Sequence, residues 1–169
     1  MPVTLLRLYA NSHIRIRLSL LHRRVNLKMF PKDSRFLIAD DSNDMLDLVH
    51  SALDEMGFQN VDMVMDGVAA LGKIKTAIEK AAPYSLVFID IKMPRLDGLT
   101  LLEALRSHVS TKSTPVIVMT TESSKQVVMR AVMHGISGYM VKPFGADDVK
   151  RKVQEIFQLL ATKVTSSKG

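Results

Sequence analysis

Cysteine is absent from the 169-residue chain, and no uncharged stretch exceeds eleven residues. Without cysteine, the chain can form neither disulfide bonds nor thiolate metal sites, and it has no cysteine nucleophile. The longest uncharged segment, 131–141, is well short of the roughly 20 residues that a membrane-spanning helix needs. Apolar residues make up 47% of the chain and charged residues 24%, a composition typical of a globular domain with a substantial core.

Acidic residues are absent from the first 28 positions, which hold six basic residues. The rest of the chain holds 17 basic and 17 acidic residues, so the formal charge of +6 comes entirely from this segment. A basic nucleic-acid-binding surface is therefore not predicted for the globular part.

We predict an N-terminal extension over 1–32, a folded domain over 33–162 and a frayed tail over 163–169. The extension fits three interpretations, namely upstream sequence with no folded role, a disordered basic arm, or an anchor for targeting or a membrane surface. A secretory signal is not expected, because no continuous apolar run follows the basic residues.

Five short apolar runs alternate with five segments of helical periodicity. The runs predict strands at 36–39, 61–65, 86–89, 116–119 and 138–141. Apolar residues spaced three or four apart predict helices over 45–56, 68–78, 99–109, 127–132 and 149–160. Continuously apolar strands are typical of a parallel sheet covered by helices on both faces, so we predict a doubly wound α/β domain.

Polar residues stand where four of these strands end. They are Asp40, Asp41, Asp90, Thr120 and Lys142. Ligands of such sheets bind beyond the carboxyl ends of the strands. A single aspartate at a strand end is most often a helix N-cap, but five such residues at one edge indicate a site.

Three carboxylates at one place repel each other unless a cation lies among them. A few hard oxygen ligands suit Mg²⁺, which also coordinates phosphate. The absence of a histidine among these residues argues against zinc or iron. A lysine and a threonine hydroxyl opposite the metal are suited to binding phosphoryl oxygens.

These residues resemble the motifs of two-component response-regulator receiver domains, especially single-domain chemotaxis regulators. The matching motifs are Asp40-Asp41, the segment 90–98, Thr120 and the segment 138–144. The resemblance covers residues 35–160 and implies a five-stranded, flavodoxin-like sheet in the order 2-1-3-4-5.

The resemblance implies that Asp90 is the phosphoacceptor and forms an acyl phosphate. It implies that Asp41, Asp90 and the backbone carbonyl of Lys92 bind Mg²⁺ directly, with Asp40 acting through water.

The remaining implied roles concern switching. Lys142 is expected to pair with Asp90 and then with the phosphoryl oxygens. Thr120 is expected to move its hydroxyl to the phosphate, and Tyr139 to turn into the space that this opens. The Lys142–Pro143 bond is expected to be cis.

Two further residues flank the approach to the acceptor. Lys92 lies two positions after Asp90, and Glu122 lies two positions after Thr120. Their opposite charges predict a pair across the phosphoryl group that slows attack by water and lengthens the phosphate lifetime.

The predicted function is a cytoplasmic, stand-alone signalling switch rather than an enzyme. About eight residues follow the last predicted helix, which are too few for a DNA-binding or enzymatic output domain. A histidine kinase or phosphotransfer protein is the expected donor. Phosphorylation is expected to alter the surface of the fourth helix, the fifth strand and the last helix. The expected target is a flagellar motor switch or another protein of a phosphorelay.

Two alternatives stay open at this point. An aspartate-nucleophile phosphohydrolase uses a similar sheet, but its motif has aspartate two positions after the nucleophile, where this chain has Lys92. A receiver that uses the basic segment 1–28 to bind nucleic acid is the other alternative.

Overall fold

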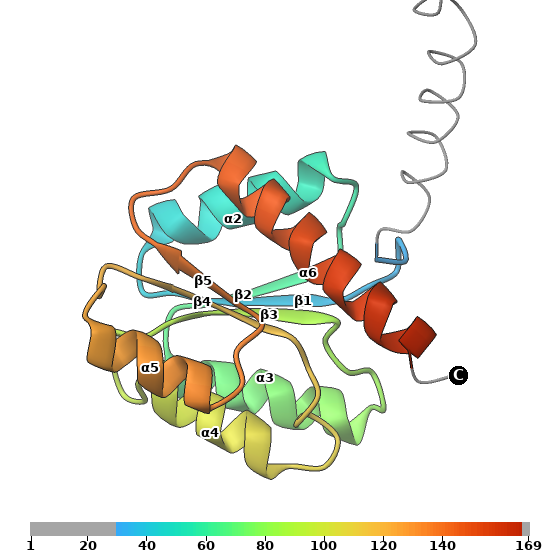
Figure 1. Cartoon of the computed structure of the whole chain (residues 1–169). Helices are drawn as coiled ribbons and strands as arrows, with labels where there is room; N and C mark the ends of the chain where they lie inside the picture. The colour runs from blue at the N-terminus through green and yellow to red at the C-terminus, as the bar shows by residue number, and fades with distance from the viewer. Residues whose placement is uncertain (1–29, 167–169) are drawn as a thin grey trace, which may run out of the picture. The chain divides into compact units, whose positions relative to one another are not determined.

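The computed structural model describes residues 30–166, in which short strands alternate with helices (Figure 1). The strands are β1 (Phe36–Ala39), β2 (Val61–Val64), β3 (Leu86–Asp90), β4 (Val116–Thr120) and β5 (Gly138–Val141). The helices are α2 (Asn43–Glu55), α3 (Gly67–Glu79), α4 (Gly98–Ser107), α5 (Lys125–Met133) and α6 (Ala146–Ser166). Every strand lies within one residue of its predicted bounds, because a buried strand requires an apolar run that the sequence displays.

The five strands form one parallel sheet in the order β2-β1-β3-β4-β5, as predicted. Ala39 of β1 pairs with Ile89 of β3, and Asp90 pairs with Met119 of β4. This register brings the carboxyl ends of β1, β3 and β4 to the same edge of the sheet.

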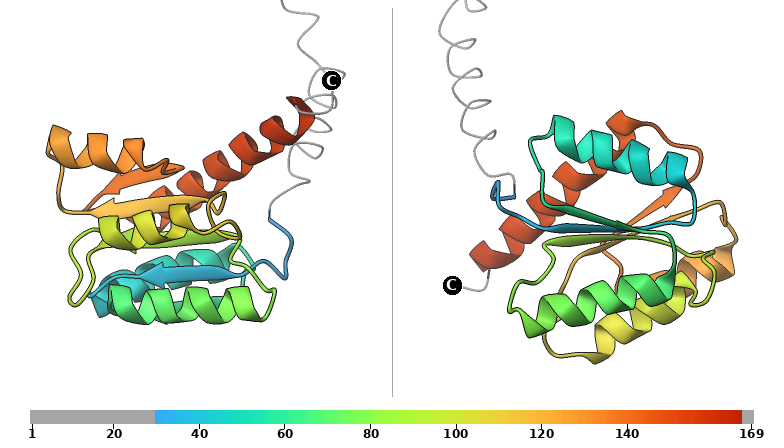
Figure 2. Two further views of the ribbon diagram at one scale, coloured as in Figure 1. Left: turned by 90° about the horizontal axis from the view of Figure 1, so that it is seen from below. Right: turned by 180° about the vertical axis from the view of Figure 1, so that it is seen from behind.

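Helices cover both faces of the sheet. In Figures 1 and 2, α2 and α6 lie on one face, and α3, α4 and α5 lie on the other. The residues of β1, β3 and β4 are all buried, whereas the edge strands β2 and β5 are partly exposed. The burial of the central strands explains why they are almost purely apolar until their last residues.

Two helices end more than one residue away from their predicted ends. Helix α4 ends at Ser107, two residues early, because His108 adopts an extended backbone conformation. Helix α6 continues to Ser166, four residues into the segment predicted to be a tail. Ala161 and Lys163 favour helix, which explains why the helix outlasts its apolar stripe.

The predictions for the basic segment 1–28 concern residues outside the described range. A compact unit of the chain begins at Lys32. Within the described residues, no helix is both long enough and apolar enough to span a bilayer.

Candidate functional site

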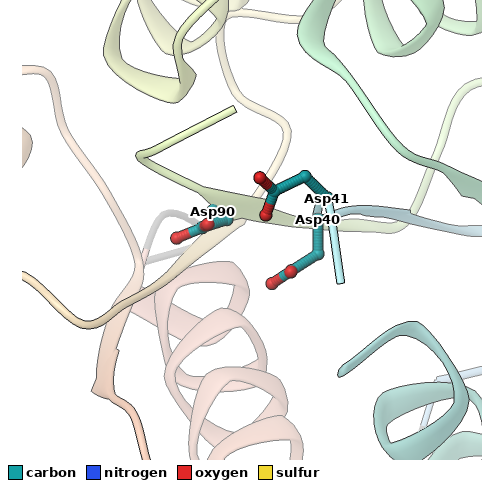
Figure 3. Close-up of side chains that lie close together, drawn as sticks. All are labelled: Asp40, Asp41 and Asp90. Atoms are coloured by element: carbon teal, nitrogen blue, oxygen red, sulfur yellow. The ribbon is translucent and has the colours of Figure 1, made fainter. Parts of the chain in front are cut away.

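Three carboxylates meet at the carboxyl edge of the sheet. Asp40 and Asp41 directly follow β1, and Asp90 is the last residue of β3. Figure 3 shows the three side chains gathered there, and each offers an oxygen within 4.8 Å of the others. Asp40 and Asp90 are buried, with 0% and 4% of their surfaces exposed, whereas Asp41 is exposed to solvent. The site therefore has two enclosed carboxylates and one that faces water.

Lys142 brings a positive charge to the buried pair. It follows β5, and its Nζ lies 2.6 Å from Asp40 Oδ2 and 3.5 Å from Asp90 Oδ2. The resemblance implied a pair with Asp90, but the shorter contact is with Asp40. The other oxygen of Asp40 accepts a hydrogen bond from the amide of Ser42 at 3.0 Å. Both oxygens of Asp40 are thus engaged by the protein itself.

Asp90, in contrast, has unused binding capacity. Its Oδ1 is buried and has no hydrogen-bond partner among the described residues. Burial raises the pKa of Asp90 most, and the charges of Asp40 and Asp41 raise it further, against the lowering effect of Lys142. A buried carboxylate with a raised pKa and an unpartnered oxygen gains from a nearby cation.

The donor set at this place suits Mg²⁺. Oxygen ligands from two or three carboxylates, with room for water and a phosphoryl oxygen, are what this small, hard ion requires. The buried, unpartnered oxygen of Asp90 and the exposed carboxylate of Asp41 are the candidates for direct ligands. Asp40 is less available as a direct ligand because Ser42 and Lys142 occupy its oxygens.

Thr120 and Tyr139 are linked through the backbone of Glu122. The hydroxyl oxygen of Thr120, which is fully buried, accepts a hydrogen bond from the Glu122 amide at 3.0 Å. The half-buried Tyr139 donates its hydroxyl proton to the Glu122 carbonyl. Nothing in the sequence indicated this bridge, because both contacts use backbone atoms, which carry no residue-specific signal.

The predicted pair of Lys92 and Glu122 is present. Lys92 Nζ lies 3.2 Å from Glu122 Oε2, and the two side chains are 65% and 32% exposed. The hydrogen bond and charge of Lys92 lower the pKa of Glu122. The two residues lie on the loops that follow β3 and β4.

Two backbone features complete the edge. The Lys142–Pro143 peptide bond is cis, as the resemblance implied. Gly98, the first residue of α4, lies so close to β3 that a Cβ there would be 2.1 Å from the Asp90 carbonyl oxygen. Glycine at this position therefore allows α4 to begin directly beside Asp90.

Comparison with known proteins shows which family has this arrangement. Residues 36–154 match the response regulator receiver domain family. The chain is a receiver domain. Chemotaxis protein CheY-3 of Vibrio cholerae is 33% identical to this receiver over 129 residues, covering 76% of this chain and 95% of that protein.

Solved structures also resemble the receiver. The structure of the V. cholerae chemotaxis protein CheY4 has a TM-score of 0.66 and 27% identity, covering 73% of this chain and 98% of that chain. A CheX–CheY–BeF₃–Mg²⁺ complex from Borrelia burgdorferi has a TM-score of 0.67 and 27% identity, covering 73% of this chain and 89% of that chain. The flavodoxin-like fold and the receiver family predicted from the sequence are both confirmed. Receivers of this family are signalling switches that typically act through phosphorylation and a change of partner.

Proposed function

We propose that this receiver accepts a phosphoryl group on Asp90 in a Mg²⁺-dependent reaction and thereby switches a protein-binding surface. The observation that carries the proposal is the state of the Asp90 carboxylate. It is buried beside Asp40 and Asp41, and one of its oxygens has no hydrogen-bond partner among the described residues. A carboxylate with only a structural role has its oxygens satisfied when it is buried.

The proposed donor is a phosphohistidine on a kinase or phosphotransfer protein. An oxygen of Asp90 attacks the phosphorus, and a P–O bond forms as the P–N bond to the donor breaks. The departing imidazole nitrogen takes the electron pair and is protonated from solvent. Asp41, Asp90 and the backbone carbonyl of Lys92 would hold Mg²⁺, which would supply positive charge to offset the negative charge of the phosphoryl oxygens.

Lys142 has two roles in this scheme. Before transfer, it holds Asp40 at 2.6 Å and leaves the unpartnered oxygen of Asp90 free. After transfer, its ammonium lies within reach of a phosphoryl group on Asp90, to which it donates a charge-assisted hydrogen bond. Lys142 thus offsets negative charge both before and after the reaction.

The proposed switch uses Thr120 and Tyr139. When the Thr120 hydroxyl turns to donate to the phosphoryl group, its hydrogen bond from the Glu122 amide is lost. The Glu122 carbonyl holds the Tyr139 hydroxyl, so rearrangement of this segment releases the ring. The affected surface comprises α5, β5 and α6, and phosphorylation biases an equilibrium between its two arrangements.

The proposed target is a protein that binds this surface in the phosphorylated state. The B. burgdorferi relative was solved in a complex with CheX, BeF₃ and Mg²⁺, which supports protein binding as the output of such a receiver. A flagellar motor switch and another phosphorelay protein are the two target classes that we propose.

Substitution of the acceptor tests the proposal. The wild-type protein, incubated with acetyl phosphate and Mg²⁺, should gain the mass of one phosphoryl group, and Asp90→Asn should gain none, because an amide does not attack phosphorus as a carboxylate does. Asp44→Asn, an exposed carboxylate on α2, is the matched control and should be labelled like the wild type. Equal labelling of Asp90→Asn would show that another residue is the acceptor. Steady release of phosphate from a phosphomonoester would instead indicate a phosphohydrolase.

A further inference from the structure

The loop between β3 and α4, residues 91–97, carries the Lys92 carbonyl that we propose as a metal ligand. This loop contains a tight turn at Arg95, where the amide of Leu96 donates to the carbonyl of Pro94 at 2.7 Å. Arg95 has a φ of 65°, in the left-handed region that residues with a Cβ rarely adopt. The turn is therefore strained and needs an interaction that holds it.

Asp66 supplies that interaction from another part of the chain. It is the N-cap of α3 and is buried, with 8% of its surface exposed. One carboxylate oxygen accepts the amide of Ala69 at 2.8 Å, and the other accepts a hydrogen bond from the guanidinium of Arg95. A single carboxylate thus caps a helix with one oxygen and fixes the strained residue of the loop with the other.

The backbones of the two segments also touch. A Cβ at Gly67, the first residue of α3, would lie 2.1 Å from the Leu96 carbonyl oxygen. Leu96 directly follows the strained residue, so the start of α3 serves as a support for the turn. Because this contact and the Asp66–Arg95 pair involve adjacent residues on both sides, the turn has little freedom to shift relative to α3.

The two ends of the loop are closed separately. The amide of Gly98 donates to the Ile91 carbonyl at 2.9 Å, and Asp97 caps α4 by accepting the amides of Leu99 and Thr100. Lys92 lies between the closed base and the turn at Arg95. Its backbone position therefore depends on both, and the turn is held from outside the loop by Asp66 and by the backbone contact with Gly67.

We propose that Asp66 and Arg95 are positioning residues for the metal site: their ion pair holds the 91–97 loop in the conformation that places the Lys92 carbonyl for Mg²⁺. This inference rests on the proposed function, because it assumes that Mg²⁺ binds at Asp41, Asp90 and Lys92. Neither positioning residue belongs to that ligand set. Their effect on the metal is transmitted through the backbone of the loop.

The choice of residue at position 95 separates positioning from simple stabilisation. Arg95→Ala removes the ion pair but keeps the Cβ, so the left-handed turn becomes unfavourable. Arg95→Gly removes the same ion pair, but glycine adopts a positive φ at no steric cost. An ion pair that only added stability would have the same effect on metal affinity in both variants. A pair that maintains the turn should matter in the alanine variant and much less in the glycine variant.

The experiment is a titration of each protein with Mg²⁺ by calorimetry, paired with urea unfolding in EDTA. Arg95→Ala should weaken Mg²⁺ binding about fivefold, as expected when an alanine must hold a left-handed conformation unaided. Arg95→Gly should bind within about twofold of the wild type. Asp66→Asn keeps an oxygen to cap α3 but loses the charge, and it should weaken binding in the same direction as Arg95→Ala. Lys73→Ala is the matched control, because it breaks an ion pair with Asp62 that involves no residue of this loop, and it should leave Mg²⁺ affinity unchanged.

The amide coupling constant of residue 95, which reports its φ, is the second readout. It should change in Arg95→Ala and stay near the wild-type value in Arg95→Gly. Wild-type binding with the same affinity in Arg95→Ala would overturn the positioning role alone, and so would equal losses in the alanine and glycine variants. Absence of Mg²⁺ binding by the wild-type protein would overturn the proposed function together with this inference.

Discussion

The two edges of the sheet each hold a cluster of charged side chains, and the clusters differ in how completely they are paired. At the amino edge, Asp62 accepts hydrogen bonds from Lys73 at 2.7 Å, from the Tyr84 hydroxyl at 2.7 Å and from Arg35 at 2.9 Å. Arg35 also donates to the Ala82 carbonyl and lies 4.6 Å above the Tyr84 ring. This cluster has two cations for one carboxylate, and both of the carboxylate's oxygens are engaged.

The carboxyl edge has the opposite balance. Asp40, Asp41 and Asp90 lie close together, but Lys142 pairs only with Asp40 and Asp90, and one oxygen of Asp90 has no partner within the described part of the chain. Burial raises the pKa of Asp62, but hydrogen bonds from its three donors outweigh burial and leave this pKa below its ordinary value. The pKa of Asp90 is raised instead. The cluster around Asp62 is fully paired, so its contribution to stability is enough to explain it. The cluster around Asp90 lacks positive charge, which indicates that it binds a ligand.

The largest effect is expected from removing the cation of the carboxyl edge. Lys142→Met should lower the free energy of unfolding by about 3 kcal/mol in EDTA, because it leaves two buried carboxylates without their ion pair. Added Mg²⁺ should recover part of this loss by taking over the neutralisation. Urea unfolding with and without Mg²⁺ measures both quantities.

Lys73→Met is the control for this comparison. Lys73 is 48% exposed, so the loss should be below about 1 kcal/mol, and Mg²⁺ should not change it. A loss of similar size in both variants would mean that burial does not distinguish the two edges.

A smaller effect is expected at the amino edge. Asp62→Asn should lower the free energy of unfolding by about 1–2 kcal/mol at pH 7, because Arg35, Lys73 and Tyr84 lose a charged acceptor. Since the folded-state pKa of Asp62 is lowered, its contribution is full above the unfolded-state pKa of about 3.9 and disappears as the pH falls through the lower folded-state value. Unfolding curves of the wild type and the variant between pH 7 and pH 2.5 measure the difference between their free energies of unfolding.

This gap in the free energy of unfolding between the wild type and Asp62→Asn should stay constant down to about pH 4 and then narrow. A gap that instead widened as the pH fell would show that the carboxylate of Asp62 destabilises the folded state. Mg²⁺ should leave the gap unchanged, in contrast to its effect on Lys142→Met.

The smallest change in stability is expected at the rim of the carboxyl edge. Lys92→Ala/Glu122→Ala removes an exposed ion pair, which is worth about 0.2–1 kcal/mol. The lifetime of the phosphoryl group should nevertheless shorten by about two- to fivefold, because the pair obstructs the line along which water attacks. Loss of phosphoryl label after the donor is removed measures the lifetime, and unchanged Mg²⁺ affinity is the internal control.

A lifetime equal to or longer than that of the wild type would show that these side chains do not shield the phosphate. If the lifetime shortens, the single variants Lys92→Ala and Glu122→Ala tell which side chain accounts for the change.

Much of the carboxyl edge could be predicted from the sequence, for a physical reason. A buried strand must be apolar, so a polar residue at its last position, such as Asp90 or Thr120, stands out against the run before it. The alternation of strands and helices then brings these ends to one edge. The Lys92–Glu122 pair was predicted in the same way, from its offsets to two strand ends, and is confirmed at 3.2 Å.

Other side-chain pairs that cross between elements could not be predicted. Asp66 and Arg95 are 29 positions apart, and Arg35 and Tyr84 are 49 apart. Whether two such residues meet depends on the packing of helices and loops, which periodicity does not specify. The closer contact of Lys142 with Asp40 than with Asp90 could not be predicted either. Both aspartates lie at the same edge of the sheet, and only the packing decides which of them is nearer to Lys142.

Gly98 limits which substitutions the surroundings of Asp90 tolerate. A Cβ at position 98 would lie 2.1 Å from the Asp90 carbonyl oxygen, so replacement there must displace β3, the strand that bears Asp90. Lys92, in contrast, is 65% exposed and can be exchanged for residues of many sizes and charges. Substitutions at position 92 can therefore vary the charge and bulk at the rim of the site while β3 and Asp90 keep their places.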